Sequence, residues 1–191
     1  MKVLVGCERS GIVREAFRRR GHDAWSCDLV PAVDRSPYHY QCNLRDLLRE
    51  PWDILIAHPE CRYLSNSGVL RLYIGGKKSN GPNAVRWQLM QEAAAFFRFC
   101  LDARIPKICI ENPVMHRYAK MLIGKPWSQT IQPWQFGEDA SKRTCLWLKG
   151  LPPLKPVNVI IRQRYANQTP SGQNKLGPAS YSASRYLFRY R

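Results

Sequence analysis

The chain has 191 residues, of which 45% are hydrophobic and 11% aromatic. This length and composition fit a globular domain with a full core and exclude an intrinsically disordered chain. Thirty Lys and Arg stand against fourteen Asp and Glu, a formal net charge of +16. That excess favours a polyanionic partner, because cations set against phosphates release condensed counterions. The alternative is a basic surface that is only solvated.

No apolar stretch approaches the roughly 20 residues needed to cross a bilayer, and the apolar run at the amino terminus is too short for a signal peptide. The seven cysteines are scattered and include no CxxC pair. This pattern argues against both a disulfide framework and a zinc ribbon. We therefore expect reduced thiols, no metal, no membrane partner and a cytoplasmic location.

Short apolar runs alternate with amphipathic stretches through the first two-thirds of the chain. In chain order, the pattern predicts a strand over residues 2–6, a helix over 11–20, a strand over 23–27, a helix over 44–49, a strand over 52–57, a helix over 84–103 and strands over 106–110 and 144–148. Such alternation is typical of an α/β fold with a doubly wound, mostly parallel sheet covered on both faces.

Two segments are basic and contain no acidic residue. Residues 62–91 carry five Lys or Arg, and a loop of this length is uncommon unless it is functional or mobile. Residues 155–191 carry seven Lys or Arg with several aromatics, and little regular structure is expected there. We expect residues 1–154 to form the α/β domain, with 62–91 as its basic loop and 155–191 as a basic aromatic C-terminal segment.

Polar groups follow most of the predicted strands. The first strand runs into GCERSG (residues 6–11), the second ends at Asp28, the third runs into HPEC (58–61), and a later one into ENP (111–113). Ligands bind outside the carboxyl ends of the strands in a doubly wound sheet. These groups together predict a site at that edge.

Two residues at this edge are candidates for covalent chemistry. Cys61 follows a buried strand through a proline, and the nearby charges of Arg62 and Arg71 favour its thiolate. The alternative is an inert loop cysteine. Glu111 directly follows an aliphatic run, where a carboxylate needs a partner; the alternative is a helix cap or an ion pair. We interpret His58 as structural rather than as a ligand.

These residues resemble a known family. PEC (59–61) and ENP (111–113) resemble the Pro-Pro-Cys and Glu-Asn-Val signatures of cytosine-5 DNA methyltransferases. DILIAHPECRYLSNSG resembles the compact members found in phages and prophages, which lack a large target-recognition domain. IENP, QPWQFGEDASKRTCLWLKGLPPL and TPSGQNKLGP are similar to later blocks of the family, in the same order. The resemblance extends to about Pro178 and implies a Rossmann-like fold of the S-adenosylmethionine-dependent methyltransferase type, in a bacterial or phage-infected cell.

The resemblance implies a DNA (cytosine-5-)-methyltransferase. Carbon 5 of cytosine is a poor nucleophile until a thiolate adds to carbon 6, and a carboxyl group at ring nitrogen 3 stabilises the charge that develops. By the resemblance, Cys61 is the nucleophile and Glu111 that carboxyl group. The substrate is a nucleic acid, DNA in preference to RNA, and a base in a duplex must be flipped out to reach them.

The resemblance also assigns a binding set for S-adenosylmethionine. The turn around Ser10 and Gly11 takes the methionine end, Asp28 the ribose hydroxyls, and Asn43 stands where the family has an adenine-contacting Asp. The expected cofactor set is Glu8, Ser10, Gly11, Asp28, Asn43 and Pro59.

Nucleic-acid binding is expected from the basic residues near the nucleophile. Lys142 and Thr144 stand where the family has two arginines. Without a recognition domain, we expect low sequence specificity. The expected contacts are Arg62, Arg71, Lys77, Lys78, Arg86 and Lys142.

The sequence departs from the family pattern at several positions. Gly11 is the one family glycine in the first loop, Glu60 replaces the second proline, and ASYSASRYLFRYR does not match the final block. These departures support an alternative, a catalytically inactive methyltransferase-like module that binds nucleic acid or a host protein. The pairing of Cys61 with Glu111 favours the enzyme. A zinc deaminase, suggested by His58-x-Glu60, is excluded because Pro-Cys-x-x-Cys is absent.

Overall fold

The computed structural model describes residues 1–161, which contain a seven-stranded sheet in the order β3-β2-β1-β4-β5-β7-β6. The strands are β1 (Lys2–Gly6), β2 (Asp23–Asp28), β3 (His39–Gln41), β4 (Ile54–Ala57), β5 (Lys107–Pro113), β6 (Gln129–Ile131) and β7 (Thr144–Lys149). Neighbours among β1 to β5 pair in parallel, whereas β7 runs antiparallel to both β5 and β6.

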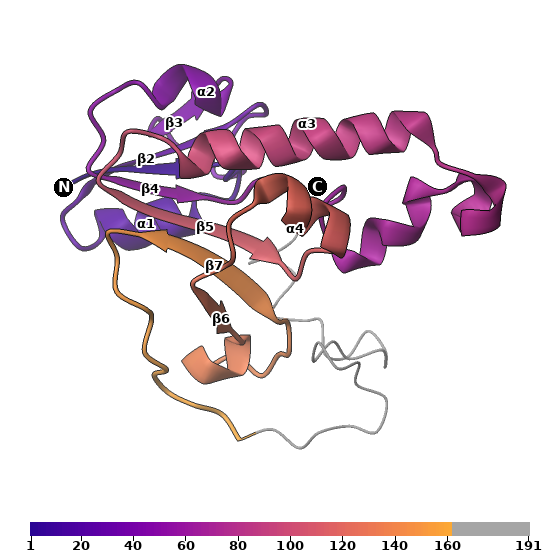
Figure 1. Ribbon diagram of the computed structural model, residues 1–191. Coiled ribbons are helices and arrows are strands. Elements are labelled where there is room, and N and C mark those ends of the chain that lie inside the picture. Colours follow the sequence, from indigo (N-terminus) through magenta and orange to yellow (C-terminus); the bar gives the residue numbers. More distant parts are fainter. Residues whose placement is uncertain (162–191) are drawn as a thin grey trace.

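Helices cover both faces of the sheet (Figure 1). They are α1 (Ile12–Arg18), α2 (Leu44–Leu47), α3 (Ala84–Leu101) and α4 (Arg117–Ile123). The predicted doubly wound, mostly parallel, Rossmann-like sheet is therefore confirmed. The sequence pattern did not predict β3, β6 or α4. The two strands have three residues each, too few to establish an alternation.

Side-chain alternation along the strands explains the two layers. In β1, Val3 and Val5 pack with Phe17 of α1 in a small cluster on one face. Leu4, between them in sequence, points to the other face and joins the larger cluster that contains Phe97 of α3. A parallel sheet buried on both faces needs apolar residues at consecutive positions, which is what the short aliphatic runs provide.

The basic segment after Cys61 contains three 3-10 turns before α3 begins at Ala84, so the last part of residues 62–91 belongs to that helix. The turns are η1 (Asn66–Leu72), η2 (Ile74–Gly76) and η3 (Lys78–Asn80). Leu64 and Leu72 are fully buried, and Trp87 Nε1 donates to the Leu72 carbonyl at 2.9 Å. This packing anchors the base of the segment against α3.

The expected C-terminal segment lies mostly outside the described residues, which end at 161. Within the described part of it, the Val157 N–H donates to the Gln135 carbonyl and the Ile160 N–H to the Trp134 carbonyl, both at 2.9 Å. Over residues 1–161, none of the helices combines the length and the apolar character needed to cross a membrane.

The direction in which strands are added reverses at β1. From there, β2 and β3 extend the sheet to one side, and β4 and β5 extend it to the other. The loops that follow β1 and β4 therefore lead away from each other at the carboxyl ends of these two strands. Such a switch point is where open α/β sheets bind their ligands.

Candidate active site

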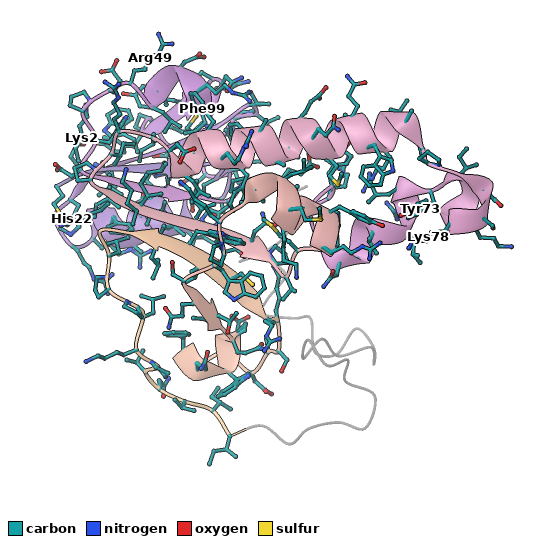
Figure 2. The ribbon with its side chains drawn as sticks, in the orientation of Figure 1. Lys2, His22, Arg49, Tyr73, Lys78 and Phe99 are labelled. Atoms are coloured by element: carbon teal, nitrogen blue, oxygen red, sulfur yellow. The ribbon has the colours of Figure 1, made fainter. Side chains whose placement is uncertain are left out.

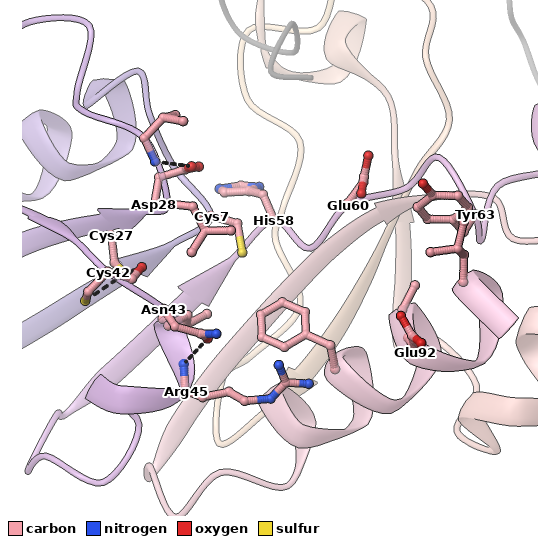
Figure 3. A pocket seen from close by; sticks show the side chains of 16 residues that line it. Cys7, Cys27, Asp28, Cys42, Asn43, Arg45, His58, Glu60, Tyr63 and Glu92 are labelled. Atoms are coloured by element: carbon pink, nitrogen blue, oxygen red, sulfur yellow. Dashed lines mark hydrogen bonds between the residues drawn. The ribbon is translucent and has the colours of Figure 1, made fainter.

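A cavity of about 580 Å³ opens at this switch point (Figure 3). Cys7 follows β1, Asp28 ends β2, Asn43 follows β3 and His58 follows β4, and all four line it. Phe96 of α3 supplies part of the opposite wall. The volume lies within the range of about 300–1,000 Å³ typical of small-molecule sites.

The cavity is more acidic than the protein around it. Asp28, Glu60 and Glu92 contribute carboxylates to its lining, whereas Arg45 contributes a guanidinium. The whole chain, by contrast, carries a net charge of +16. This local excess of carboxylates suits a ligand with positively charged groups.

Two residues of the expected cofactor set line the cavity. An oxygen of the Asp28 carboxylate accepts a hydrogen bond from the Val30 N–H at 3.2 Å, which holds the side chain at the end of β2. Asn43 caps α2, because its side-chain oxygen accepts from the Arg45 N–H at 3.0 Å. Both groups are therefore oriented by the backbone beside them before any ligand binds.

Glu8, Ser10 and Gly11 belong to the start of α1 and are not part of the cavity lining. The Glu8 side chain is buried and accepts from the N–H groups of Val13 at 2.7 Å and Arg14 at 3.2 Å, while Ser10 Oγ donates to it at 3.1 Å. The first N–H groups of a helix have no intrahelical acceptor, and Glu8 supplies one. In this structure the Glu8 carboxylate caps the amino end of α1.

Pro59 is also buried, and its carbonyl accepts a hydrogen bond from Asn112 Nδ2 at 2.8 Å. Asn112 is only 1% exposed, so this bond is protected from water. It ties the turn after β4 to the end of β5. The backbone that carries Cys61 is fixed as a result.

The register of β4 against β5 brings the two predicted catalytic residues to one place. Ala57 pairs with Ile110, so the chain continues into Cys61 on one strand and Glu111 on the next at the same edge. Glu111 acts electrostatically on the Cys61 thiol. The thiol and the carboxyl group therefore leave neighbouring parallel strands at the same edge of the sheet.

His58 contacts Glu111, a role that the sequence interpretation missed. His58 Nδ1 lies 3.2 Å from Glu111 Oε2, and the two side chains are 28% and 14% exposed. Position 58 follows Ala57 and position 111 follows Ile110, its register partner, so the two side chains emerge side by side. The signal in the sequence was a histidine directly after a buried strand, but its partner depends on the register.

The environment of the Cys61 thiol differs from the sequence interpretation. Burial raises the pKa of Cys61 above its ordinary value, and the charges of Glu111 and Glu60 raise it further, while Lys142 lowers it. Arg62, expected to favour the thiolate, instead forms an ion pair with Glu60 at 3.1 Å. The charge that favours the thiolate comes from Lys142, far away in the sequence.

The reversed direction of β7 explains the position of Lys142. Because β7 is antiparallel to β5, its first residue Thr144 pairs with Pro113, at the carboxyl end of β5. The segment just before β7 therefore reaches the edge of the sheet that holds Cys61. A basic side chain there can act on both the thiol and a bound anion.

Replacing Lys142 by alanine should shift the reactivity of Cys61 toward higher pH. Loss of the positive charge leaves burial and two carboxylates to raise the pKa of the thiol, so less thiolate forms at a given pH. Alkylation of Cys61 by iodoacetamide, followed by mass spectrometry across pH, measures this shift. Lys142→Arg keeps the charge and should retain the wild-type profile; an unshifted profile for Lys142→Ala would contradict the assignment.

Two of the expected nucleic-acid contacts, Arg62 and Arg86, interact with other residues of the protein. Arg62 pairs with Glu60, as described above. The Arg86 guanidinium lies 4.3 Å from the centroid of the Tyr63 ring and donates to the Arg62 carbonyl at 2.5 Å. Burial lowers the pKa of Arg86, and the neighbouring charges of Arg71 and Arg62 lower it further. Arg86 thus joins α3 to the residue after the nucleophile.

The remaining basic residues of the segment are exposed. Arg71, Lys77 and Lys78 all present their side chains to solvent. Lys78 and Tyr73 lie at the end of the molecule beyond the start of α3 (Figure 2), with Lys78 Nζ 5.8 Å from the Tyr73 ring centroid. A cation beside an aromatic ring suits contact with a nucleic-acid strand.

No family model matches the sequence, and no curated protein matches it. Solved structures do match. One is the crystal structure of a candidate DNA modification methyltransferase encoded within prophage Cp- of E. coli, with 13% sequence identity and a TM-score of 0.45. The alignment covers 76% of this chain and 45% of that chain, so the chain spans less than half the length of that protein. A likeness at this level assigns no activity.

Proposed function

We propose that the protein transfers a methyl group from S-adenosylmethionine to carbon 5 of cytosine in nucleic acid, with DNA as the preferred substrate. The observation that carries the proposal is that Cys61, in the turn after β4, and Glu111, near the end of the adjacent parallel strand β5, lie at the same edge of the sheet, where the charge of Glu111 raises the pKa of the thiol. The acidic cavity at the switch point of the same sheet supports it. The resemblance of PEC and ENP to the family signatures gives these two residues their roles.

The chemistry follows from the two side chains. The Cys61 thiolate adds to carbon 6 of an extruded cytosine, and the Glu111 carboxyl group gives a proton to ring nitrogen 3. Electron density then gathers at carbon 5, which takes the methyl group. Loss of the carbon 5 proton to water, release of the thiolate and return of the nitrogen 3 proton to Glu111 restore the aromatic ring.

The residues that line the cavity fit the expected cofactor. Asp28 would hold the ribose hydroxyls and Asn43 would contact adenine, since both are oriented by backbone hydrogen bonds at the cavity wall. The carboxylate of Glu92 suits the positive charges of the cofactor, whereas that of Glu60 is paired with Arg62. When bound, S-adenosylmethionine supplies an electrophilic methyl group.

Incubation with tritiated S-adenosylmethionine and a panel of DNA and RNA tests the proposal. Nucleoside digestion should place the label in 5-methylcytosine. A label in another nucleoside would contradict the cytosine-5 assignment. Absence of label, together with retained nucleic-acid affinity, would favour the alternative.

The alternative is a methyltransferase-like module that binds nucleic acid or a host protein without catalysis. The observation that favours it is the first loop, where Glu8 and Ser10 are hydrogen-bonded within the start of α1 rather than lining the cavity. Equilibrium binding of S-adenosylmethionine separates the two functions. The enzyme must bind S-adenosylmethionine saturably, and Asp28→Ala should weaken that binding. The inactive module has no need to bind S-adenosylmethionine.

Removing two lysines from the basic segment should weaken binding to every oligonucleotide alike. Lys77 and Lys78 are exposed, so the double alanine variant should flatten the plot of log affinity against log salt by up to about two charges. The matched control is the double alanine variant of Arg19 and Arg20, two exposed residues just after α1 that do not line the cavity. A shallow wild-type slope, or tight binding to one sequence only, would contradict sequence-tolerant binding.

A further inference from the structure

His58 belongs both to the wall of the cavity and to the immediate surroundings of Glu111. Its ring lines the cavity (Figure 3), and its Nδ1 lies 3.2 Å from Glu111 Oε2. The two oxygens of the carboxyl group are thus in different situations. Oε2 has a ring nitrogen beside it, whereas Oε1 is buried and has no hydrogen-bond partner among the described residues.

A buried oxygen without a partner is uncommon in folded proteins, because it loses its contact with water and gains nothing in return. Such an atom, on a side chain that contacts a residue of the cavity wall, marks a place where a ligand group can complete the hydrogen bonding. The carboxyl group has one oxygen anchored and one available. With one oxygen held in place, the carboxyl group can direct its other oxygen at a single ring nitrogen.

Resting on the proposed function, we infer that His58 is a positioning residue for Glu111. Its Nδ1–H donates to Oε2 and holds the carboxyl group so that Oε1 faces the pyrimidine. In this arrangement the proton of the neutral ring is on Nδ1, because donation from Nδ1 requires it there. Asn112, the next residue of β5, is itself held by its bond to the Pro59 carbonyl at 2.8 Å, which steadies the backbone beside Glu111.

The proton balance closes without a charge change on His58. Before addition, the proton of the carboxyl group is on Oε1, and Oε2 accepts from Nδ1–H. As the bond between the Cys61 sulfur and carbon 6 forms, the ring electrons move toward nitrogen 3, which takes the Oε1 proton and leaves a carboxylate. The bond from Nδ1–H to Oε2 strengthens at that moment, because its acceptor becomes charged. When the sulfur leaves, nitrogen 3 returns the proton to Oε1.

Replacement of His58 tests this role in the step before methyl transfer. Release of tritium from carbon 5 of cytosine in DNA, measured without S-adenosylmethionine, requires thiolate addition with protonation of nitrogen 3, exchange of the carbon 5 hydrogen with water, and departure of the thiolate, but no methyl transfer. His58→Leu removes the donor and should slow this release about 10- to 100-fold. His58→Asn places an amide donor near the position of Nδ1 and should restore the rate to within several-fold of wild type.

Two further measurements distinguish positioning from a role in the cavity wall. His22→Leu, which removes a histidine at the amino end of β2, should leave the rate unchanged. In methylation assays, His58→Leu should lower kcat at saturating S-adenosylmethionine rather than only raise KM. Equal tritium release by His58→Leu and wild type, or an effect on KM alone, would overturn the inference.

The tautomer of His58 provides a readout that does not require activity. Nitrogen-15 NMR of the wild type should show the Nδ1 proton in place, and Glu111→Ala should return the ring toward the tautomer mixture of an unrestrained imidazole. A ring that is indifferent to Glu111→Ala would overturn the inference. A Glu111-dependent tautomer in a protein that releases no tritium would confirm the contact while overturning the proposed reaction and the role of His58 in it.

Discussion

Cys61→Ser should abolish methyl transfer, with a loss of at least about a thousand-fold, because a serine hydroxyl cannot replace the thiolate as the nucleophile toward carbon 6. Burial raises the pKa of the Cys61 thiol, and the charge of Lys142 partly offsets this effect. The same variant should lose covalent trapping by DNA that contains 5-fluorocytosine. In the wild type, fluorine at carbon 5 blocks the elimination step and leaves the adduct in place.

The fold and the nucleic-acid affinity of Cys61→Ser should remain close to wild type, because Cys61 is partly exposed and the exchange removes little volume. Cys109→Ser is the matched control. Burial, with a further contribution from Glu111, raises the pKa of Cys109 to about 12, so this thiol stays protonated and its replacement should leave activity intact. An active Cys61→Ser protein, or an adduct mapped to another cysteine, would show that Cys61 is not the nucleophile.

Glu111→Gln should lower the rate of methyl transfer by about 100- to 1,000-fold, because the amide can hydrogen-bond to nitrogen 3 but cannot give it a proton. The loss should fall on kcat, since the contact matters most when charge develops on the ring. Single-turnover kinetics at saturating DNA and S-adenosylmethionine measure it. The substitution also changes the acceptor for His58, so its effect and that of His58→Leu should be less than additive in the double variant.

Glu50→Gln is the control for Glu111→Gln, since Glu50 is an exposed carboxylate in the turn before β4 and should tolerate the exchange. Thermal unfolding of both variants shows whether the loss is chemical. A Glu111→Gln protein with the same kcat as wild type would rule out proton donation by this residue. A change confined to KM would assign Glu111 to binding instead.

Much of the fold could be predicted because local patterns set it. Five strands and three helices were predicted near their observed positions, since their apolar runs and helical periodicity are local properties of the chain. β3 and β6 were missed because three residues establish no alternation, and their pairing partners lie elsewhere in the chain. The first part of residues 62–91 was predicted as a loop, and in the structure it forms 3-10 turns. Leu64 and Leu72 are buried in the core, and Trp87 donates a hydrogen bond to the Leu72 carbonyl.

The sequence by itself determined which residues stand at the carboxyl ends of the strands, because the chain order of polar groups and apolar runs is local. Cys61 and Glu111 were candidates on that ground alone. Tertiary structure decided which side chains surround these two residues and how deeply the thiol is buried. The register of β4 against β5 sets His58 beside Glu111, the reversed β7 brings Lys142 toward the thiol, and burial raises the pKa of Cys61. It also turned Glu8 inward to cap α1. Register, strand direction and burial depend on residues distant in the chain, and no local pattern specifies them.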